Sequence, residues 1–161
     1  MPPVNNITRM LDAKKVDYAA YETPAEKLGA LETARFLNLP PEQVFKTIVV
    51  ARIAPRAKPI LALIPAPNKV DLKLLAAVLN EKKVVLTTQT EAEALTGLQA
   101  GGISPLALIH KGFQTVIDTA AKSFTHINVS GGQRGINISI RVEGLAKLVN
   151  ARFGVVSQKE E

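Results

Sequence analysis

The sequence predicts an α+β fold built on a mixed, curved or barrel-like β-sheet, and two patterns lead to this prediction. Stretches rich in β-branched residues, which are typical of strands, are interspersed with stretches whose apolar residues recur at helical spacing. Together they indicate about six strands and four or five helices. The strands do not alternate strictly with the helices, which disfavours a doubly wound parallel sheet.

The N-terminal quarter predicts two helices on either side of an extended segment. Apolar residues at helical spacing predict the first helix over residues 6–16, with Asn6 able to cap it. Residues 18–23 are expected to form a strand or an extended turn. Residues 28–39 again show helical spacing, and the two prolines that follow end this helix because proline has no backbone N–H to continue it.

The middle of the chain predicts a β-hairpin and a capped helix. Residues 44–53 and 60–64 are rich in aliphatic residues, and the short proline-containing segment between them suits a reversal of the chain. Asp71 can cap the helix that carries the apolar residues from Leu72 to Leu79.

The second half of the chain predicts further short strands around a glycine-rich stretch. Residues 84–86 suggest a short strand, and Thr90 and Glu93 have the spacing of a capping box at the start of the next helix. Three more strands and a closing helix are predicted over residues 115–117, 125–129, 136–142 and 143–150. The last five residues, SQKEE, are expected to be frayed.

The composition indicates a cytosolic globular protein in which residues 1–161 form a single domain. Apolar residues make up 47% and charged residues 21%, which are ordinary values for such a protein. A chain of this length buries roughly 70% of the surface that it exposes when unfolded. Apolar runs fall short of the roughly 18 residues that span a bilayer, and the N-terminus lacks the order of a secretory signal. We therefore expect no membrane association and a cytoplasmic location.

Counts of particular residues limit the chemistry. The chain has no cysteine, which excludes disulfides, thiolate nucleophiles and cysteine-ligated zinc. Its two histidines, His110 and His126, are too few for a histidine-only metal cage and make no convincing Ser–His–Asp set. We expect a site without a metal or another cofactor. The net charge of +6 and the pI of about 9.7 fit a polyanionic partner such as RNA or a nucleotide.

The first of three segments that could carry chemistry is FKT. Lys46 lies between Phe45 and Thr47 in an otherwise apolar predicted strand. Because side chains alternate across a strand, Lys46 and Ile48 share one face. A lysine in this setting either reaches solvent or points into a cavity that holds an anion, and this segment alone leaves both interpretations open.

The other two segments are rich in glycine. Successive backbone N–H groups within residues 101–105, GGISP, can hold an oxyanion or a phosphate. Residues 129–135, VSGGQRG, join two predicted strands, and Arg134 could form a forked contact with a phosphate or a carboxylate. An ordinary turn is the alternative for both segments.

FKTIVV, GGISPLA and VSGGQRG, at these spacings, resemble the YbaK/EbsC family, whose members are free-standing relatives of the editing domain inserted in bacterial prolyl-tRNA synthetases. The resemblance runs from the first predicted helix to the last. It implies a mixed α+β fold with a curved sheet of six or seven strands, and hydrolytic editing of mischarged tRNA. Members of the most similar type remove cysteine from proline tRNA, whereas relatives remove alanine. Prolyl-tRNA synthetase is an implied partner.

The resemblance, together with Arg134, defines a candidate site. Its expected catalytic residues are Lys46, Gly101 and Gly102, and its expected substrate-binding residues are Tyr21, Phe45, Thr47, Ile103, Ser104, Pro105, Ser130, Gly131, Gly132, Arg134 and Asn137. Some relatives carry an acidic residue at the position of Asn137. An amide cannot act as a carboxylate base, so a mechanism that requires a base there does not fit this chain.

A cysteine ester can be cleaved without a nucleophile from the protein. The substrate thiol can attack its own carbonyl and leave as a thiolactone, and positioned intramolecular attack contributes roughly 7–11 kcal/mol. Backbone N–H groups near Gly101 and Gly102 would stabilise the oxyanion, while Lys46 would anchor the phosphate or ribose of the terminal adenosine. Serine and alanine esters would react poorly because they lack the thiol.

Two alternatives remain open at this stage. One is a deacylase for alanyl-tRNA or another aminoacyl-tRNA that uses a bound water. The other is a non-catalytic module that binds tRNA or a synthetase. The central expectation is that Lys46 and the two glycine-rich loops line one shared cavity.

Overall fold

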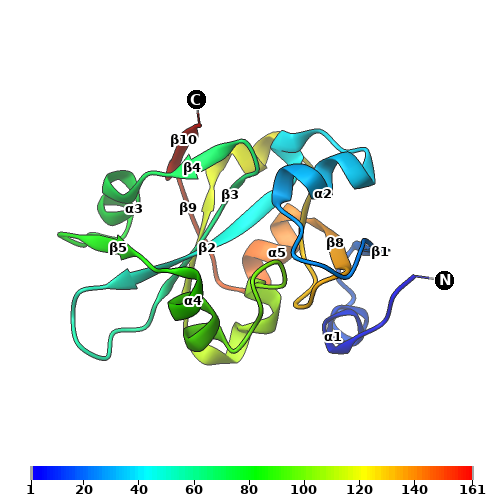
Figure 1. Cartoon of the computed structure of the whole chain (residues 1–161), viewed down its shortest axis with the longest axis horizontal. Coiled ribbons are helices and arrows are strands. Elements are labelled where there is room, and N and C mark those ends of the chain that lie inside the picture. The colour runs from blue at the N-terminus through cyan, green and yellow to red at the C-terminus, as the bar shows by residue number, and fades with distance from the viewer. Residues whose placement is uncertain (1, 161) are drawn as a thin grey trace.

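The computed structural model describes residues 2–160 and confirms the α+β class (Figure 1). The α-helices in that range are α1 (Asn6–Ala13), α2 (Ala30–Leu37), α3 (Leu72–Val78), α4 (Gln89–Thr96) and α5 (Val142–Leu148). The strands are β1 (Tyr18–Glu22), β2 (Phe45–Arg52), β3 (Ile60–Pro65), β4 (Asn68–Val70), β5 (Val84–Leu86), β6 (Gln114–Asp118), β7 (His126–Ser130), β8 (Ile136–Arg141), β9 (Arg152–Gly154) and β10 (Ser157–Lys159). None of these helices is long and apolar enough to cross a bilayer.

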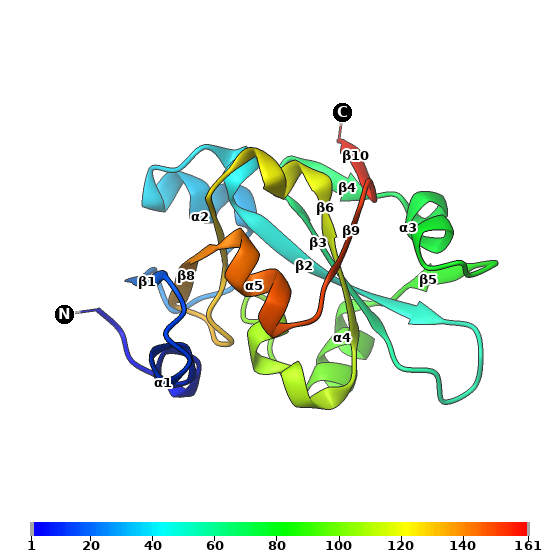
Figure 2. The same ribbon diagram turned by 180° about the vertical axis from the view of Figure 1, so that it is seen from behind.

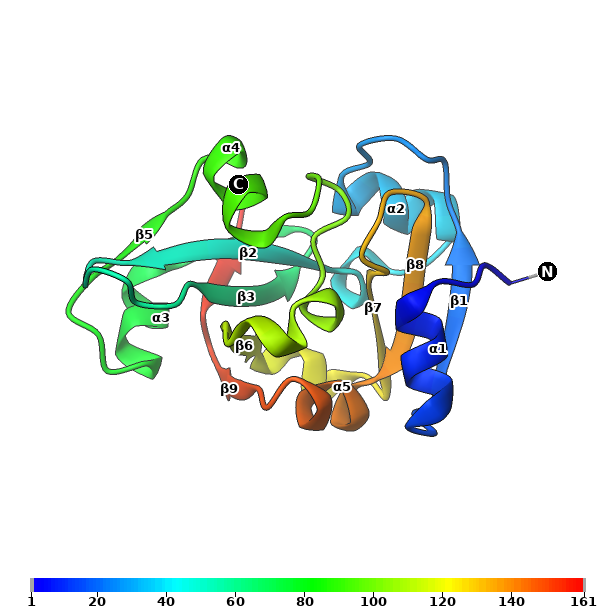
Figure 3. The ribbon, with the colours of Figure 1, turned by 90° about the horizontal axis from the view of Figure 1, so that it is seen from below.

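The strands form three sheets rather than one. A five-stranded sheet has the order β5-β2-β3-β6-β9, a three-stranded sheet the order β1-β8-β7, and β10 pairs with β4. The expected barrel-like sheet is wrong, because the two larger sheets are joined by only one β-bridge, between Val44 just before β2 and Asn128 of β7, and no continuous ladder among the described strands closes the structure. Figure 3 shows the strands of the three-stranded sheet running across the direction of β2 and β3.

The predicted hairpin of β2 and β3 is confirmed. The two strands pair antiparallel from Phe45 opposite Pro65 to Val50 opposite Ile60. Every residue of β3 is buried, because successive side chains enter two different apolar clusters on the two faces of the sheet. Leu61 and Leu63 belong to the larger cluster, which also contains the apolar faces of β7 and β8.

Helix caps differ from the sequence prediction at two places. Asn5, not Asn6, caps α1, and its side chain and that of Thr8 form a reciprocal capping box. The backbone of Asn5 is extended, which is the conformation that a cap requires. Asp71 caps α3 as expected, by accepting a hydrogen bond from the Leu74 N–H at 3.0 Å.

The capping box of α4 lies two residues earlier than predicted. Thr88 and Glu91 form it, in place of Thr90 and Glu93, because the extended backbone of Thr88 already leads into the helix. The Glu91 carboxylate accepts hydrogen bonds from Thr88, and these bonds lower the pKa of Glu91 because they favour its charged form. Both boxes contain threonine at the right spacing from glutamate, so the pattern alone could not choose between them.

The C-terminal tail is more ordered than expected. Residues 157–159 form β10 against β4, and the Ser157 hydroxyl donates a hydrogen bond to the buried carboxylate of Asp118 at 2.7 Å. The Val156 N–H donates to the same carboxylate at 3.1 Å. A buried carboxylate needs such donors, so Asp118 fixes the segment that precedes the tail.

The helices lie around the sheets in a way that leaves one end of β2 open. In Figures 1 and 2, α1, β1 and β8 occupy one end of the molecule, and α3 and β5 occupy the opposite end. The strand β5 covers β2 only from Val50 to Arg52. Among the strands that the structure describes, none therefore pairs with the edge of β2 from Lys46 to Ile48 on the side away from β3, and the candidate site lies along this edge.

Candidate active site

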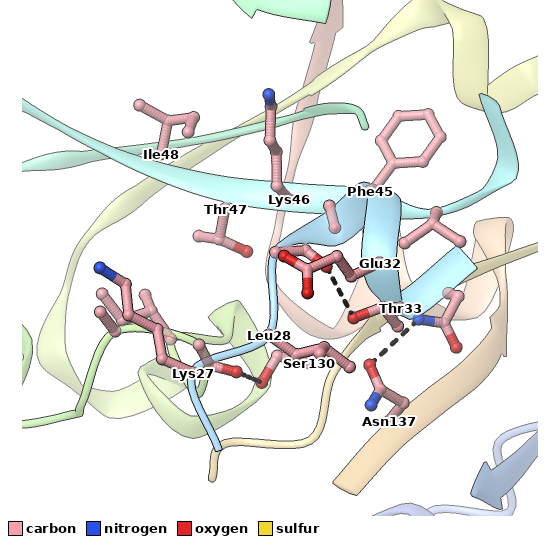
Figure 4. A pocket seen from close by; sticks show the side chains of 17 residues that line it. Lys27, Leu28, Glu32, Thr33, Phe45, Lys46, Thr47, Ile48, Ser130 and Asn137 are labelled. Atoms are coloured by element: carbon pink, nitrogen blue, oxygen red, sulfur yellow. Dashed lines mark hydrogen bonds between the residues drawn. The ribbon is translucent and has the colours of Figure 1, made fainter. Parts of the chain in front are cut away.

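A cavity of about 510 Å³ surrounds the open edge of β2 (Figure 4). Its walls come from residues 44–48, the start of α2, the loop at residues 100–103 and the polar face of β7 and β8. This volume lies within the range typical of small-ligand sites. Segments far apart in the sequence therefore meet at one concave surface.

The three-stranded sheet presents a polar face to this cavity. Along β7, Ile127 and Val129 point into the apolar core, whereas Asn128 and Ser130 line the cavity. Asn137 of β8 lines it as well, and its Cα pairs with that of Tyr21 on β1. Paired residues of antiparallel strands share a face, so Tyr21 lies on the cavity side, beside rather than among the lining residues.

Two amides form a short network on this face. Asn128 Nδ2 donates to Asn137 Oδ1 at 3.2 Å, and Asn137 Nδ2 donates to Thr23 Oγ1 at 3.0 Å. Asn128 is only 2% exposed, and its Oδ1 has no hydrogen-bond partner within residues 2–160. Leaving a buried acceptor unpaired costs about 1–3 kcal/mol, so this oxygen is a candidate binding group for a donor on a ligand.

The open edge of β2 supplies backbone groups. The Val44 carbonyl accepts a hydrogen bond on the β3 side, and the Val49 carbonyl accepts one from Thr87 on the opposite side. Backbone direction alternates along a strand, so the Thr47 N–H and C=O point away from β3 and toward the cavity. They have no protein partner within residues 2–160.

Lys46 lines the cavity from one side of this edge. Figure 4 shows Lys46 and Ile48 extending from one side of β2 and Thr47 from the other. Burial lowers the pKa of Lys46, and the carboxylate of Glu160 opposes this shift. The Lys46 ammonium group therefore lies at the rim of the cavity, on the side of Glu160 and away from Ser130 and Asn137.

The glycine-rich loops pack tightly against each other. A Cβ on Gly102 would lie 2.8 Å from the Cα of Gln133, and Arg134 Nε donates to the Ala100 carbonyl at 2.7 Å. The Gly102 N–H already donates to the Gln99 carbonyl at 2.8 Å, so it is not free to bind an oxyanion. The Gly101 N–H has no protein partner within residues 2–160.

The second loop is equally crowded. A Cβ on Gly131 would lie 2.6 Å from Ile136 Cγ2, and one on Gly132, whose φ is +91°, would lie 2.6 Å from Ile7 Cδ1. Ser104 is fully buried and its hydroxyl accepts a hydrogen bond from the Leu106 N–H. These residues shape the loops rather than the inner surface of the cavity.

The sequence-predicted residues thus divide into two groups. Those that line the cavity are Phe45, Lys46, Thr47, Gly101, Ile103, Ser130 and Asn137. Those that lie outside the lining are Tyr21, Gly102, Ser104, Pro105, Gly131, Gly132 and Arg134. The structure brings Lys46, two residues of the first glycine-rich loop and one residue of the second to the same cavity.

Sequence reasoning missed the wall formed by the start of α2. Gly29 is the N-terminal cap of α2 and has no side chain to cap it, so within residues 2–160 the first N–H groups of the helix remain unpaired. Lys27 and Glu32 also line the cavity. Glycine at the cap position, two residues after Lys27, was the available signal, since an uncapped helix start favours an anion.

Metal ligands do not gather here. Within residues 2–160, no three histidine, aspartate or glutamate side chains are close enough together to hold a metal ion. His126 Nε2 lies 3.1 Å from Asp17 Oδ2, outside the cavity, and His110 lines a separate groove. The cavity therefore offers backbone N–H donors, amide and hydroxyl groups, and two lysines.

The sequence matches a known family of proteins. Residues 24–148 match the model of the aminoacyl-tRNA editing domain, and the chain belongs to this family, the YbaK family. EbsC of Enterococcus faecalis, named as a candidate Cys-tRNA(Pro)/Cys-tRNA(Cys) deacylase, is 34% identical over 157 residues, which cover 96% of this chain and 94% of EbsC.

Two solved structures share the fold. The crystal structure of a hypothetical protein superposes with a TM-score of 0.86 and 19% identity, covering 96% of this chain and all of the other. The crystal structure of a candidate trans-editing enzyme for prolyl tRNA synthetase gives a TM-score of 0.77 and 19% identity, covering 99% of this chain and all of the other. At this identity the two structures establish the fold, and the family match establishes tRNA editing.

Proposed function

We propose that this protein is a cytosolic Cys-tRNA(Pro) deacylase that removes cysteine attached in error to proline tRNA. The observation that carries the proposal is that unpaired N–H donors, from Thr47 and Gly101, lie with Lys27 around one small cavity, while the Lys46 ammonium stands at its rim. The similarity to EbsC supports the choice of cysteine. In this proposal a partner such as prolyl-tRNA synthetase, and not this chain, selects the proline tRNA.

The proposed reaction uses the substrate's own thiol. The cysteine sulfur attacks the ester carbonyl carbon, the new C–S bond replaces the bond to the ribose oxygen, and the thiol proton ends on that oxygen. The product is cysteine thiolactone, which water then opens to free cysteine. The first step is formally a lyase reaction, and the overall outcome is that of an aminoacyl-tRNA hydrolase. Intramolecular attack of this kind needs positioning more than it needs a protein base.

The residues around the cavity then have distinct roles. The Thr47 and Gly101 N–H groups stabilise the oxyanion that forms on the carbonyl, in place of Gly101 and Gly102 together, because the Gly102 N–H is already used. Lys46 holds the terminal phosphate or ribose at the rim. The unpaired Oδ1 of Asn128 accepts a hydrogen bond from the substrate α-amino group.

A second candidate function rests on one residue. The carboxylate of Glu32 lines the same cavity and could activate a water, which would allow hydrolysis of alanyl-tRNA or another aminoacyl-tRNA. Replacing Glu32 with Gln separates the two candidates. The thiol route keeps its rate in this variant, whereas the water route loses it.

The test of the proposed function is a substrate panel. Deacylation of Cys-, Ala-, Ser- and Pro-tRNA(Pro) is measured with a metal chelator present, and the cysteine reaction is searched for thiolactone. The proposal predicts turnover of the cysteine ester alone and a trapped thiolactone. Equal turnover of the alanine and cysteine esters would contradict the thiol mechanism, and no turnover on any ester would leave only the non-catalytic binding module.

A further inference from the structure

A second hollow lies on the other side of the loop at residues 130–134. Two neighbouring depressions share Asn6, Ile7 and Ala107, and so form one groove, the larger part of which has a volume of about 800 Å³. The start of α1 forms one wall. The 3₁₀ turns η2 (Pro105–Ala107) and η3 (Ile109–Lys111) form the other. We call this surface the α1 groove; its polar and charged residues include Arg9, Asn6, Lys58, His110, Lys111 and Gln133.

The α1 groove carries positive charges that are not neutralised by ion pairs within residues 2–160. Arg9, Lys58 and Lys111 are exposed, and none of them forms an ion pair within residues 2–160. Among the residues that the structure describes, no aspartate or glutamate lines the groove. The Arg9 guanidinium donates to Asn6 Oδ1 at 3.0 Å, which holds it against the wall. Like charges on one concave surface favour an anionic partner.

The uncharged polar groups in the groove suit the same partner. Asn5 and Asn6 at the start of α1, together with Gln133, place side-chain amides along one wall. Amides, lysines and arginines are the groups that contact nucleic-acid phosphates and sugars without reading the sequence. An RNA backbone offers one phosphate per nucleotide and can meet several of these groups at once.

The α1 groove lies next to the candidate active site, on the other side of one loop. Ser130 lines the cavity, and the next residue, Gly131, lines the groove. Asn5 Nδ2 donates to the Gly131 carbonyl at 2.9 Å, which ties α1 to the loop that separates the two hollows. Consecutive Cα atoms are 3.8 Å apart, so only a few ångströms of chain divide them. A long ligand whose end lies in the cavity therefore has to cross only this loop to reach the groove.

We propose that the α1 groove binds the phosphate backbone of the tRNA acceptor stem while the aminoacylated 3′ end occupies the cavity. This inference rests on the proposed function, since it takes the cavity as the place of the ester. Arg9, Lys58 and Lys111 each neutralise a phosphate, and the contact is independent of base sequence. Such a contact recognises tRNA without reading the anticodon.

The test compares two triple variants of equal charge. The groove variant carries Arg9→Gln, Lys58→Gln and Lys111→Gln. The control variant carries Lys69→Gln, Lys73→Gln and Lys83→Gln, which lie on exposed positions of β4, α3 and the segment before β5. Figure 1 shows α3 and β5 at the opposite end of the molecule from α1, with β4 between α3 and the middle of the molecule. Denaturant unfolding checks that both variants keep the wild-type stability.

Two measurements are made on each variant. The first is the affinity for a short acceptor-stem RNA duplex at several salt concentrations, by fluorescence anisotropy. The second is kcat/KM for Cys-tRNA(Pro) and for the small ester cysteinyl-adenosine. The groove variant is expected to bind the duplex about 10- to 100-fold more weakly, and the slope of log K against log salt falls by about 1 for each cation removed. Its turnover of cysteinyl-adenosine stays at the wild-type level.

Three outcomes would overturn the inference. Equal weakening of duplex binding in both variants means net charge alone is responsible. Loss of cysteinyl-adenosine turnover in the groove variant means that the change reached the cavity. Unchanged RNA binding with lost binding to purified prolyl-tRNA synthetase would assign the groove to a protein partner. If neither ester is turned over, the proposed function fails, while the duplex affinities still decide what the groove binds.

Discussion

Asn128 donates a hydrogen bond to Asn137 at 3.2 Å, while its own Oδ1, buried at the wall of the cavity, has no partner within residues 2–160. A fold selected for stability alone would fill this position with an apolar residue of similar volume, because an unpaired buried acceptor is costly. A site that must receive a donor keeps the acceptor free. The geometry therefore predicts opposite effects of one substitution on stability and on activity.

Replacing Asn128 with Leu is expected to leave the free energy of unfolding unchanged or to raise it by about 1 kcal/mol, since the unpaired oxygen is removed along with one hydrogen bond. The same variant should lose about 10- to 100-fold in kcat/KM for Cys-tRNA(Pro), because the α-amino group loses its acceptor. Urea unfolding and steady-state deacylation measure the two effects. A variant that is less stable by several kcal/mol would show that Asn128 is a structural residue.

Replacing Lys46 with Met is expected to increase stability at pH 7 and to remove activity. Burial lowers the pKa of Lys46, so between that value and about 10.5 the unfolded chain binds more protons than the folded one. The free energy of unfolding of the wild type therefore rises as the pH rises through this window. The Met variant is more stable than the wild type below the window, and this difference disappears above it. Unfolding curves at several pH values test this sign; a stability advantage that grows with pH would contradict it.

Glu160 is predicted to raise the pKa of Lys46. Its carboxylate opposes the effect of burial, so Glu160→Gln lowers the pKa of Lys46 further. If the ammonium binds the terminal phosphate or ribose, KM for Cys-tRNA(Pro) should begin to rise at a lower pH in this variant than in the wild type. A KM–pH profile shows the displacement. Glu81→Gln, which removes a carboxylate paired with Arg52 instead, is the control and should leave the profile in place.

Gly102 is predicted to be required by the packing of the two loops. An alanine Cβ there would meet the backbone of Gln133 at 2.8 Å, so Gly102→Ala should cost about 1–3 kcal/mol and displace both loops. Gly97→Ala is the matched control, because Gly97 has a φ of +74° but nothing within 4 Å of its Cβ position. The control should lose about 1–2 kcal/mol from backbone strain and keep its activity.

Chemical denaturation measures the stability of the two variants, and deacylation assays under native conditions measure their activity. Equal activity in the two variants would show that the loop contact does not shape the cavity. A larger loss of stability in the control would show that backbone strain, not the contact with Gln133, dominates.

Local patterns predicted the elements well because they depend on neighbours in the chain. The aliphatic runs of β2 and β3 and the cap at Asp71 were all readable from a few adjacent residues. The barrel was predicted wrongly because closure depends on which strand edges meet over long distances. In the structure β2 and β7 share one bridge, Val44 with Asn128, which no local pattern specifies.

A site residue could be predicted from the sequence only where its type was unusual for its local surroundings. Lys46 stood out as a charge in an apolar strand, and it does line the cavity. Gly102 was interpreted as an oxyanion donor, although its N–H and its missing Cβ serve the packing of the loops. Asn128 was overlooked, yet its alternation with Ile127 and Val129 already indicated a polar residue facing away from the core.

The most direct measurement is single-turnover deacylation of Cys-tRNA(Pro) by the wild type, by Lys46→Met and by Lys73→Met, a matched change on the remote helix α3. If the cavity at the open edge of β2 is the editing site, Lys73→Met keeps the wild-type rate and Lys46→Met is slower by about 100-fold or more. Wild-type turnover in a folded Lys46→Met variant would contradict the assignment of this cavity to the reaction.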